Sequence, residues 1–363
     1  MARASVPVNT ASTFRNIIRI SLGGKALRVQ FTNEFGVLPL KLEEAHVGII
    51  GGKGAVRPGT DHVLTFEGRP SAMIPAGGVI FSDSVPMDVK AMSSVAISEY
   101  IPLQEIAIAS CHMMASSTNY FTAGDAVSAS STEGWRRWEA WCFLKAVDVL
   151  RAKTSAALVT LGDSITDGEK SGTDQNHRWP DLLLERLQGN PKTRNIAVLN
   201  AGINGNSLMS HGAGSNAIAR FDRDVIGMSG VKYLLILEGI NDLKYPPGPR
   251  EEDRPASAEY LIMGFKQLIT RAHQHGLKVF LATLTPYQGG PYFTECGEKV
   301  RQSVNSWIRS CKGADGVIDF DEAMRDPSNP TRLLPRFDSG DHLHPNDAGY
   351  ATMSRTVDLS LFR

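Results

Sequence analysis

The sequence predicts an all-β domain over residues 1–150, followed over residues 151–363 by an α/β domain with three layers (α/β/α) and a parallel sheet. Apolar and polar residues alternate in the first part, whereas continuous apolar runs alternate with segments of helical period in the second. Strands that are apolar on both faces indicate a parallel sheet covered by helices on both sides. A chain of 363 residues is long enough for two domains with substantial cores.

The N-terminal part shows the period of two that half-buried strands have. In LRVQFT (27–32) and VPMDVK (85–90), every second side chain is apolar. Glycine and proline clusters such as GGKGAVRPGTD (51–61) separate the runs, a pattern typical of a β sandwich or jelly roll. The stretches SLGGKA (21–26) and GIIGGKGA (48–55) lack a hydroxyl residue after the lysine, so we interpret them as turns and not as phosphate-binding loops.

Five apolar runs predict the strands of the C-terminal domain: AALVTL (156–161), IAVLN (196–200), YLLIL (233–237), KVFLATL (278–284) and GVIDF (316–320). Segments 257–276 and 295–312 have apolar residues at helical spacing. In the first of them Leu261 and Phe265 share a face, and Gly276 is suited to end the helix in the left-handed conformation.

Polar residues follow these predicted strands. After the first four runs stand Gly162, Asp163 and Ser164; then Gly205; then Asn241 and Asp242; then Tyr287. The segment DSGDHLHPNDAGY (338–350) adds acids and histidines near the C-terminus. Because ligands bind beyond the carboxyl ends of parallel strands, we expect these groups to meet at one edge of the sheet.

Ser164 is the candidate nucleophile of this edge. A serine hydroxyl needs a base to remove its proton and a third group to orient that base. His344 is the candidate base, and Asp341, three residues earlier, is placed to orient its ring. His342 is a rival base, and a plain turn at Ser164 or a metal site made of Asp341, His342 and His344 are the alternatives.

Acyl transfer also needs donors for the oxyanion that develops on the substrate. The backbone N–H groups of Ser164 and Gly205 and the side-chain amide of Asn241 are the candidates. Taken alone, Gly205 equally suits a turn and Asn241 a helix N-cap. Candidate substrate contacts are Asp163, Arg178, Trp179 and Tyr287, with Trp179 also suited to the core. The Pro-rich segment LKYPPGPREEDRPAS (243–257) is either a wall beside the site or a surface loop.

Four short blocks together resemble the SGNH hydrolase superfamily, the GDSL esterases and lipases. They are GDS (162–164), NAGINGNS (200–207), GIND (239–242) and DHLH (341–344), in that order. The resemblance extends from about residue 153 to the end of the chain and implies a flavodoxin-like hydrolase domain. It implies Ser164 as nucleophile, Asp341 and His344 as its triad partners, and Ser164, Gly205 and Asn241 as the oxyanion hole.

The β domain ahead of the hydrolase and the segment NHRWPDLLLERL (176–187) resemble a bacterial subfamily of arylesterases and acylhydrolases. This implies a serine esterase for short-chain esters, such as acetyl esters of carbohydrate or aryl esters. It also implies an extracytoplasmic location, with any leader absent from this chain. No G-x-S-x-G elbow surrounds Ser164, so the domain does not resemble an α/β-hydrolase.

Other classes of function find little support in composition. Lys plus Arg and Asp plus Glu both number 38, which gives no reason to expect a nucleic acid or an anionic membrane as partner. No apolar run approaches the ~20 residues that span a bilayer. The first twenty residues lack the pattern of a signal peptide. Nothing indicates a cofactor or an oligomeric state.

The four cysteines show no C-x-x-C spacing, so we expect no zinc site. Cys296 and Cys311 stand at the two ends of one predicted helix, roughly 22 Å apart and too far for a disulfide. A bond between Cys111 and Cys142 is possible, but free, buried thiols are the default expectation.

Three alternative functions are also compatible with the sequence. The same triad is compatible with a lipase or thioesterase for longer acyl groups. The β domain either shapes the cleft or makes the chain mainly a carbohydrate-binding protein with incidental hydrolase activity. A metal phosphoesterase would use Asp163, Asp341 and the histidines, and a chelator would inhibit it.

Overall fold

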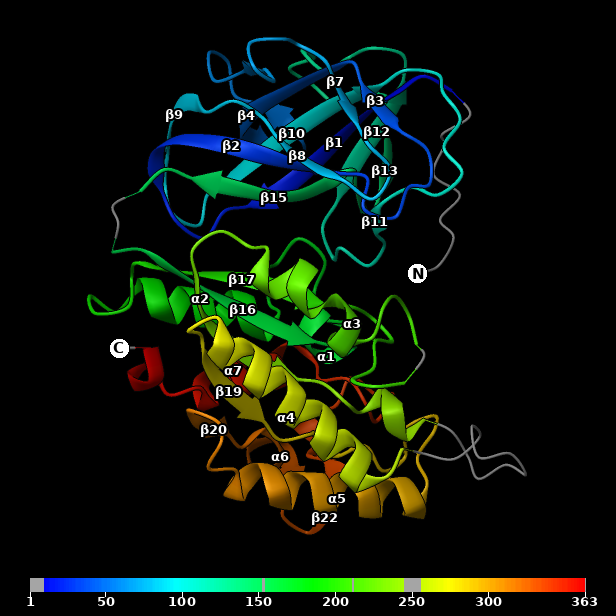
Figure 1. Ribbon diagram of the computed structural model, residues 1–363, viewed down its shortest axis with the longest axis vertical. Helices are drawn as coiled ribbons and strands as arrows, with labels where there is room; N and C mark the ends of the chain where they lie inside the picture. The colour runs from blue at the N-terminus through cyan, green and yellow to red at the C-terminus, as the bar shows by residue number, and fades with distance from the viewer. Residues whose placement is uncertain (1–9, 152–153, 211, 245–255, 363) are drawn as a thin grey trace. The chain divides into compact units, whose positions relative to one another are not determined.

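The computed structural model describes residues 10–151, 154–210, 212–244 and 256–362. The chain divides into two compact units, Met1–Lys153 and Thr154–Arg363 (Figure 1). Most of the Pro-rich segment, residues 245–255, lies outside the described residues. In the described part of the chain, no helix is long and apolar enough to cross a membrane.

The first unit is an antiparallel β structure. Its strands are β1 (Ser12–Arg19), β2 (Gly24–Thr32), β3 (Leu40–Leu42), β4 (Glu44–Gly52), β5 (Ala55–Val56), β6 (His62–Leu64), β7 (Ala72–Ile74), β8 (Val79–Phe81), β9 (Val85–Val89), β10 (Ser94–Ile101), β11 (Cys111–His112), β12 (Asn119–Ala123), β13 (Arg136–Trp138), β14 (Trp141–Cys142) and β15 (Leu144–Val149).

Two main sheets share the core of this unit. One sheet has seven strands, with β13-β12-β1-β10-β4-β5 in order and β6 also paired with β4. The other has four, with β15-β2-β8 in order and β9 also paired with β2. Both sheets contribute to one apolar core, through side chains that include Phe14, Val29, Phe31, Val47, Met87 and Ile97. The predicted all-β domain is confirmed, and the predicted alternation buries Val85, Met87 and Val89 of β9.

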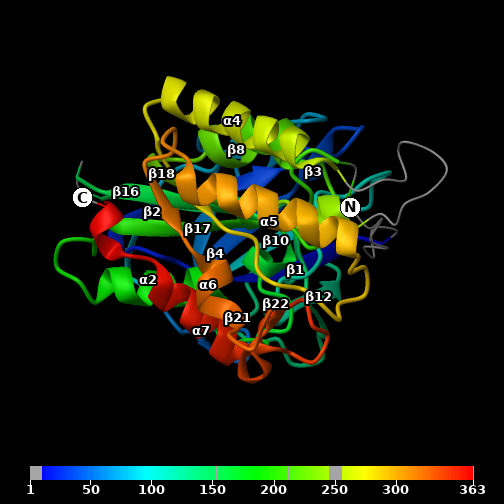
Figure 2. The ribbon, with the colours of Figure 1, turned by 90° about the horizontal axis from the view of Figure 1, so that it is seen from below.

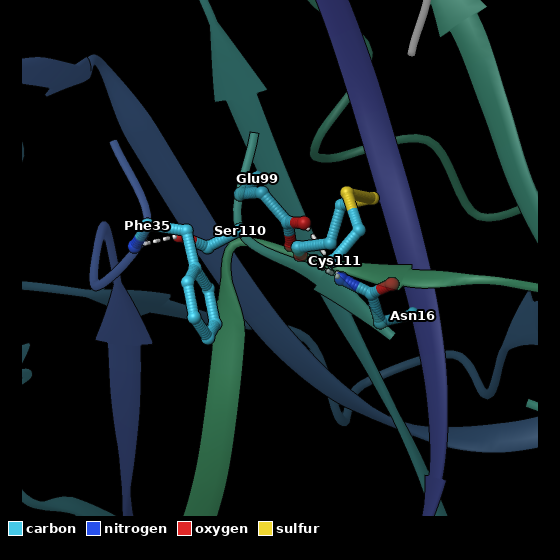
Figure 3. The surroundings of a disulfide bond; sticks show 6 residues. Asn16, Phe35, Glu99, Ser110 and Cys111 are labelled. Atoms are coloured by element: carbon cyan, nitrogen blue, oxygen red, sulfur yellow. Dashed lines mark hydrogen bonds between the residues drawn. A yellow bond between two sulfur atoms is a disulfide. The ribbon is translucent and has the colours of Figure 1, made fainter. Parts of the chain in front are cut away.

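A disulfide corrects the expectation of free thiols at Cys111 and Cys142. These residues are register partners in the short pair β11–β14, and their Cα atoms are 4.0 Å apart. Asn16 and Glu99 lie close to the bond (Figure 3). Neither periodicity nor spacing reveals this contact, because it depends on the pairing of two strands 31 residues apart. Cys296 and Cys311 are free, as expected, but Cys296 is exposed and Cys311 only partly buried, so the expectation that these thiols are buried is wrong.

The second unit is an α/β structure. Its main elements are β16 (Ala156–Gly162), α1 (Ser164–Asp167), α2 (Trp179–Gln188), β17 (Ile196–Gly202), α3 (Ala217–Phe221), η1 (Asp222–Ile226), β18 (Val231–Leu237), η2 (Asn241–Leu243), α4 (Ala258–Gln274), β19 (Lys278–Ala282), α5 (Glu295–Ser310), β20 (Gly316–Ile318), α6 (Phe320–Met324), β21 (Arg325–Asp326), β22 (Asn329–Leu333), η4 (Pro335–Phe337), α7 (Asp347–Thr356) and η5 (Leu359–Phe362).

Its central sheet is parallel and has the strand order β17-β16-β18-β19-β20. Counted along the chain this is 2-1-3-4-5, the flavodoxin-like order. Helices α4 and α5 cover one face and α2, α6 and α7 the other (Figure 2). The predicted three-layer architecture is therefore confirmed.

Continuous apolar strands explain why both faces of this sheet are covered. Leu158, Val159 and Leu161 of β16 have no exposed surface, so both faces of the strand are buried. In α4 most of the predicted apolar stripe is buried, including Leu261 and Phe265. The strand order changes direction at β16, which lies between β17 and β18, and this switch point is where such sheets bind ligands.

Candidate active site

Ser164 stands at the carboxyl end of β16, as the first residue of α1. The preceding Asp163 is the N-cap of this short helix, and its Oδ1 accepts a hydrogen bond of 2.9 Å from the N–H of Ile165. The helix ends at Gly168, whose φ of 96° lies in the left-handed region. The stretch between strand and helix is therefore a turn, and this turn presents Ser164 at the switch point of the sheet.

His344 and Asp341 complete a continuous chain of hydrogen bonds with Ser164. Ser164 Oγ lies 2.8 Å from His344 Nε2, and His344 Nδ1 lies 2.7 Å from Asp341 Oδ2. The other oxygen of Asp341 accepts hydrogen bonds from the backbone N–H groups of His344 and Leu343. These bonds hold the carboxylate still, so that with Nδ1 protonated, Nε2 is free to accept the proton of Ser164.

His342, the rival base, lies apart from this chain of hydrogen bonds. Its backbone φ is 61°, and its half-exposed ring is bonded to Asp338 at 2.5 Å. The structure therefore brings His344, and not His342, to Ser164. The left-handed backbone at His342 turns its side chain away from that of His344, which sequence spacing alone does not resolve.

The three predicted oxyanion donors follow three neighbouring strands. Ser164 follows β16, Gly205 follows β17 and Asn241 follows β18. Gly205 has a φ of 73°, a conformation that favours glycine. Among the described residues, neither the N–H of Ser164 nor that of Gly205 donates a hydrogen bond within the protein. Asn241 Nδ2 donates to the carbonyl of Asn206 at 2.7 Å, which leaves its second N–H without an acceptor there.

Asp242 ties the loop after β17 to the loop after β18. Its carboxylate accepts hydrogen bonds from the backbone N–H groups of Leu208, Met209 and Ser210, at 2.7 to 3.0 Å. The adjacent Asn241 is thereby held against the loop that carries Gly205. The sequence places Asp242 next to Asn241 but does not indicate what its carboxylate binds.

The buried side chain of Arg220 forms hydrogen bonds at the carboxyl ends of the strands that precede these loops. This buried side chain, from α3, donates to the carbonyls of Gly162 at 2.9 Å and of Ala201 at 2.6 Å. It also donates to Asn206 Oδ1 and forms an ion pair of 3.5 Å with buried Glu238. One guanidinium group thus connects the ends of β16, β17 and β18.

The two aspartates beside the triad serine and histidine have opposite shifts of pKa. Burial raises the pKa of Asp163 to about 7, although its bond from Ile165 opposes the shift. Burial alone would also raise the pKa of Asp341, but its hydrogen bonds from the backbone and ring of His344 lower that pKa to about 2. Asp341 is therefore ionised at neutral pH, where it can stabilise a protonated His344.

Glu169 and Tyr292 also belong to this site, and neither was predicted. Glu169 Oε2 lies 3.4 Å from His344 Nε2, and the carboxylate accepts a hydrogen bond from the side chain of Asn204. Tyr292 Oη donates to Asn241 Oδ1 at 3.0 Å. Both residues come from loops without a periodic pattern, so no local signal in the sequence indicates them.

The predicted substrate contacts are largely buried. Asp163 caps α1, and Arg178 is the N-cap residue of α2. Trp179 has no exposed surface and packs edge-to-face on Phe320. Tyr287 is likewise fully buried, so the prediction that Trp179 and Tyr287 line the site is wrong. Large aromatic side chains of this kind gain most by joining the core, which both residues do.

Metal-ligating residues do not gather elsewhere in the described part of the chain. No group of three or more His, Cys, Asp or Glu residues there is arranged to hold a metal ion. The alternative set predicted at the C-terminus is divided, because His342 is bonded to Asp338 whereas Asp341 and His344 are bonded to each other.

Residues 160–352 match the GDSL-like lipase/acylhydrolase family, a match that covers more than half of the chain. A GDSL-like lipase from Bacteroides thetaiotaomicron is 21% identical, over 58% of this chain and 90% of that one, with a TM-score of 0.44. An acetylxylan esterase from Geobacillus stearothermophilus is 22% identical, over 56% and 94%, with a TM-score of 0.42. A carbohydrate esterase family 2 enzyme with a carbohydrate binding domain, from Corynascus thermopiles (Myceliophthora fergusii), is 12% identical over 97% and 92%, with a TM-score of 0.44. No curated protein matches.

Proposed function

The chain belongs to the GDSL-like lipase/acylhydrolase family and is an ester hydrolase of that family, and we propose that it is a serine esterase for short-chain carboxylic esters. The single observation that carries this proposal is the hydrogen-bond chain from Ser164 through His344 to Asp341. A hydroxyl bonded to a carboxylate-oriented imidazole is the arrangement that activates a serine nucleophile.

The proposed reaction has two steps. Ser164 Oγ attacks the ester carbonyl while His344 Nε2 takes its proton, and His344 then returns this proton to the leaving alcohol. The negative charge on the carbonyl oxygen is met by the N–H groups of Ser164, Gly205 and Asn241. In the second step His344 takes a proton from water, the hydroxide attacks the acyl-enzyme, and Ser164 regains its proton as the acid leaves.

The position of Glu169 favours a substrate whose leaving alcohol carries a further hydroxyl group, as in an acetylated carbohydrate. Its carboxylate lies 3.4 Å from the Nε2 atom that protonates the leaving alcohol. The second oxygen of Glu169 lies 3.8 Å from Lys170 Nζ, and the Glu169 side chain remains 22% exposed. An ionised carboxylate only accepts hydrogen bonds, so a hydroxyl near the ester oxygen can donate to it. Aryl esters lack that hydroxyl and would use the triad alone.

The first experiment measures hydrolysis of p-nitrophenyl acetate, butyrate and octanoate by the purified protein. We expect acetate to react fastest, Ser164→Ala to abolish turnover, and EDTA to have no effect. Preference for octanoate would instead indicate a lipase or thioesterase of longer chains. Activity that survives Ser164→Ala, or that EDTA removes, would contradict the proposal and favour the metal phosphoesterase.

A second experiment tests the role of Glu169 with two esters of equal acyl group, 2-hydroxyethyl acetate and ethyl acetate. We expect Glu169→Gln to lower kcat/KM for 2-hydroxyethyl acetate, relative to that for ethyl acetate, by about tenfold. Only the hydroxyethyl ester loses a hydrogen bond to a charged acceptor. Any effect on His344 acts on both esters and cancels. Glu259→Gln, an exposed position in the first turn of α4, is the matched control. An unchanged ratio would remove the argument for a hydroxylated alcohol.

We also propose an extracytoplasmic location. The disulfide Cys111–Cys142 supports it, because disulfides persist in oxidising compartments and are rare in the cytosol. Fractionation of the host cells with an antibody against the protein tests this, and recovery in the cytosol would contradict it.

A further inference from the structure

The side-chain amide of Asn241 is held by one hydrogen bond at its oxygen and one at its nitrogen. Tyr292 Oη donates to Oδ1 at 3.0 Å, and Nδ2 donates to the carbonyl of Asn206 at 2.7 Å. Rotating the amide by half a turn would place its oxygen against the carbonyl oxygen of Asn206, which is repulsive. The two contacts therefore determine which way the remaining N–H points.

Tyr292 is itself held by its surroundings. Its loop joins β19 to α5, its ring packs on buried Tyr287 with a centroid distance of 6.2 Å, and Lys244 Nζ lies 5.9 Å from its ring centroid. Burial, and then the charges of Asp163 and other nearby carboxylates, raise the pKa of Tyr292. Its hydroxyl therefore remains a donor at every pH at which the enzyme is assayed.

We propose that Tyr292 is a positioning residue that directs the free N–H of Asn241 to the oxyanion. This inference rests on the proposed function, in which Asn241 is an oxyanion donor. The hydroxyl of Tyr292 does not touch the substrate in this proposal but acts through the amide of Asn241. The oxyanion forms only as the reaction proceeds. A misdirected N–H therefore reduces the stabilisation of the transition state and leaves the binding of the substrate unchanged.

The test is Tyr292→Phe, which keeps the ring and removes only the hydroxyl. We expect kcat for p-nitrophenyl acetate to fall about tenfold with KM unchanged, which is the loss of one hydrogen bond expressed only in the transition state. In an Asn241→Ala background, which itself should cost on the order of 10²–10³ in kcat, the same change should have no further effect. This non-additivity is what a residue acting through Asn241 produces and a merely structural residue does not.

Tyr287→Phe is the matched control. Tyr287 is the ring partner of Tyr292 in the same loop, and among the described residues no hydrogen bond joins its hydroxyl to Asn241. Removing that hydroxyl should leave kcat and KM as they are. A normal kcat in Tyr292→Phe, or an equal loss with and without Asn241, would overturn the inference.

Crystal structures of the wild type and Tyr292→Phe give a readout that does not need turnover. We expect the Asn241 amide to rotate or become disordered in the variant, with the backbone unchanged. If the wild type lacks esterase activity that depends on Ser164, the proposed function fails, and the crystal structures still decide whether Tyr292 orients Asn241. An unmoved amide would overturn the inference even if esterase activity is present.

Discussion

Arg15 of the β unit and Arg220 of the α/β unit are both buried, and their guanidinium groups bind different kinds of partner. Arg15 of the β unit donates to Ser98 Oγ and to three backbone carbonyls, those of Gly54, Val127 and Ala129. Arg15 is a residue of β1, so these hydrogen bonds attach loops of the β unit to that strand. Arg220 of the α/β unit instead binds the carbonyls at the ends of the strands that carry the reactive groups.

The two units also differ in what they leave unsatisfied. In the β unit the unpaired buried atoms include two oxygens, Asn16 Oδ1 and Glu99 Oε2, on side chains that bond to each other through their other atoms. In the α/β unit, the Ser164 and Gly205 N–H groups and one N–H of Asn241 donate to no described acceptor. These three donors at one sheet edge are the ones that the proposed oxyanion hole requires.

We expect the largest effect when a carboxylate is removed from each unit in turn and the two variants are compared. Asp341→Asn should lower kcat by about 10⁴, because an amide can hold His344 in the wrong tautomer. Glu99→Gln, at a fully buried carboxyl of the β unit bonded to Asn16, should leave kcat unchanged. Steady-state kinetics on p-nitrophenyl acetate decide this. A comparable loss in both variants would show that the reactive edge is not confined to the α/β unit.

The next effect compares the two arginines directly. Arg15→Met and Arg220→Met should each lower the free energy of unfolding by about 3–5 kcal/mol, the cost of leaving buried partners unpaired. Only Arg220→Met should also lower kcat per folded molecule, since it releases the ends of β16 and β17. Denaturant titrations followed by circular dichroism give the folded fraction, to which the rates are then normalised. An active site insensitive to Arg220→Met would mean that Asp242 alone holds these loops.

Much of this arrangement follows from local patterns. The alternating residues of β9, the apolar runs of the parallel sheet and the residues after each strand predict both folds and bring Ser164, Asn241 and His344 to one edge. Each of these predictions depends on backbone periodicity and on strand ends, which short segments of sequence specify.

The rest depends on contacts between distant segments. Tyr287 and Tyr292 stand in one loop, and nothing local tells that the first is core and the second reaches Asn241. Arg220 and Glu169 have the composition of ordinary surface residues, yet they contact strand ends and His344. The disulfide likewise needs the register of β11 and β14. Side-chain partners of this kind appear only once the tertiary fold is known.

A smaller effect concerns the disulfide, which belongs to the β unit alone. Cys111→Ala combined with Cys142→Ala should lower the stability of that unit by about 2–4 kcal/mol, because the closed loop restricts its unfolded state. The paired change Cys296→Ala with Cys311→Ala, in the α/β unit, should have little effect. Urea unfolding of the wild type and the two double variants is the measurement, and alkylation of the unreduced, denatured wild type should add two labels. Four labels would refute the bond.

The smallest effect concerns the pH dependence of stability, which should distinguish two carboxyl groups of the same site, Asp163 and Asp341. Asp163 has a folded pKa of about 7, above the ~3.9 of an unfolded aspartate, so the folded state holds the extra proton between these values. Its contribution to stability therefore falls as pH rises through this window, by about 1 kcal/mol between pH 6 and pH 7. Asp163→Asn should flatten that decline, with the amide oxygen still able to cap Ile165.

Asp341 has the opposite sign and a different window. Its folded pKa of about 2 lies below the unfolded value, so its contribution is present above pH ~4 and is lost as pH falls toward 2. Asp341→Asn should therefore change the slope of the plot of stability against pH only in acid, and Asp163→Asn only between pH 4 and 7. Thermal unfolding across pH 2 to 8 measures both. If the two variants change the same window, burial rather than hydrogen bonding governs Asp341, and the distinction between a capping and an orienting carboxylate at this site is lost.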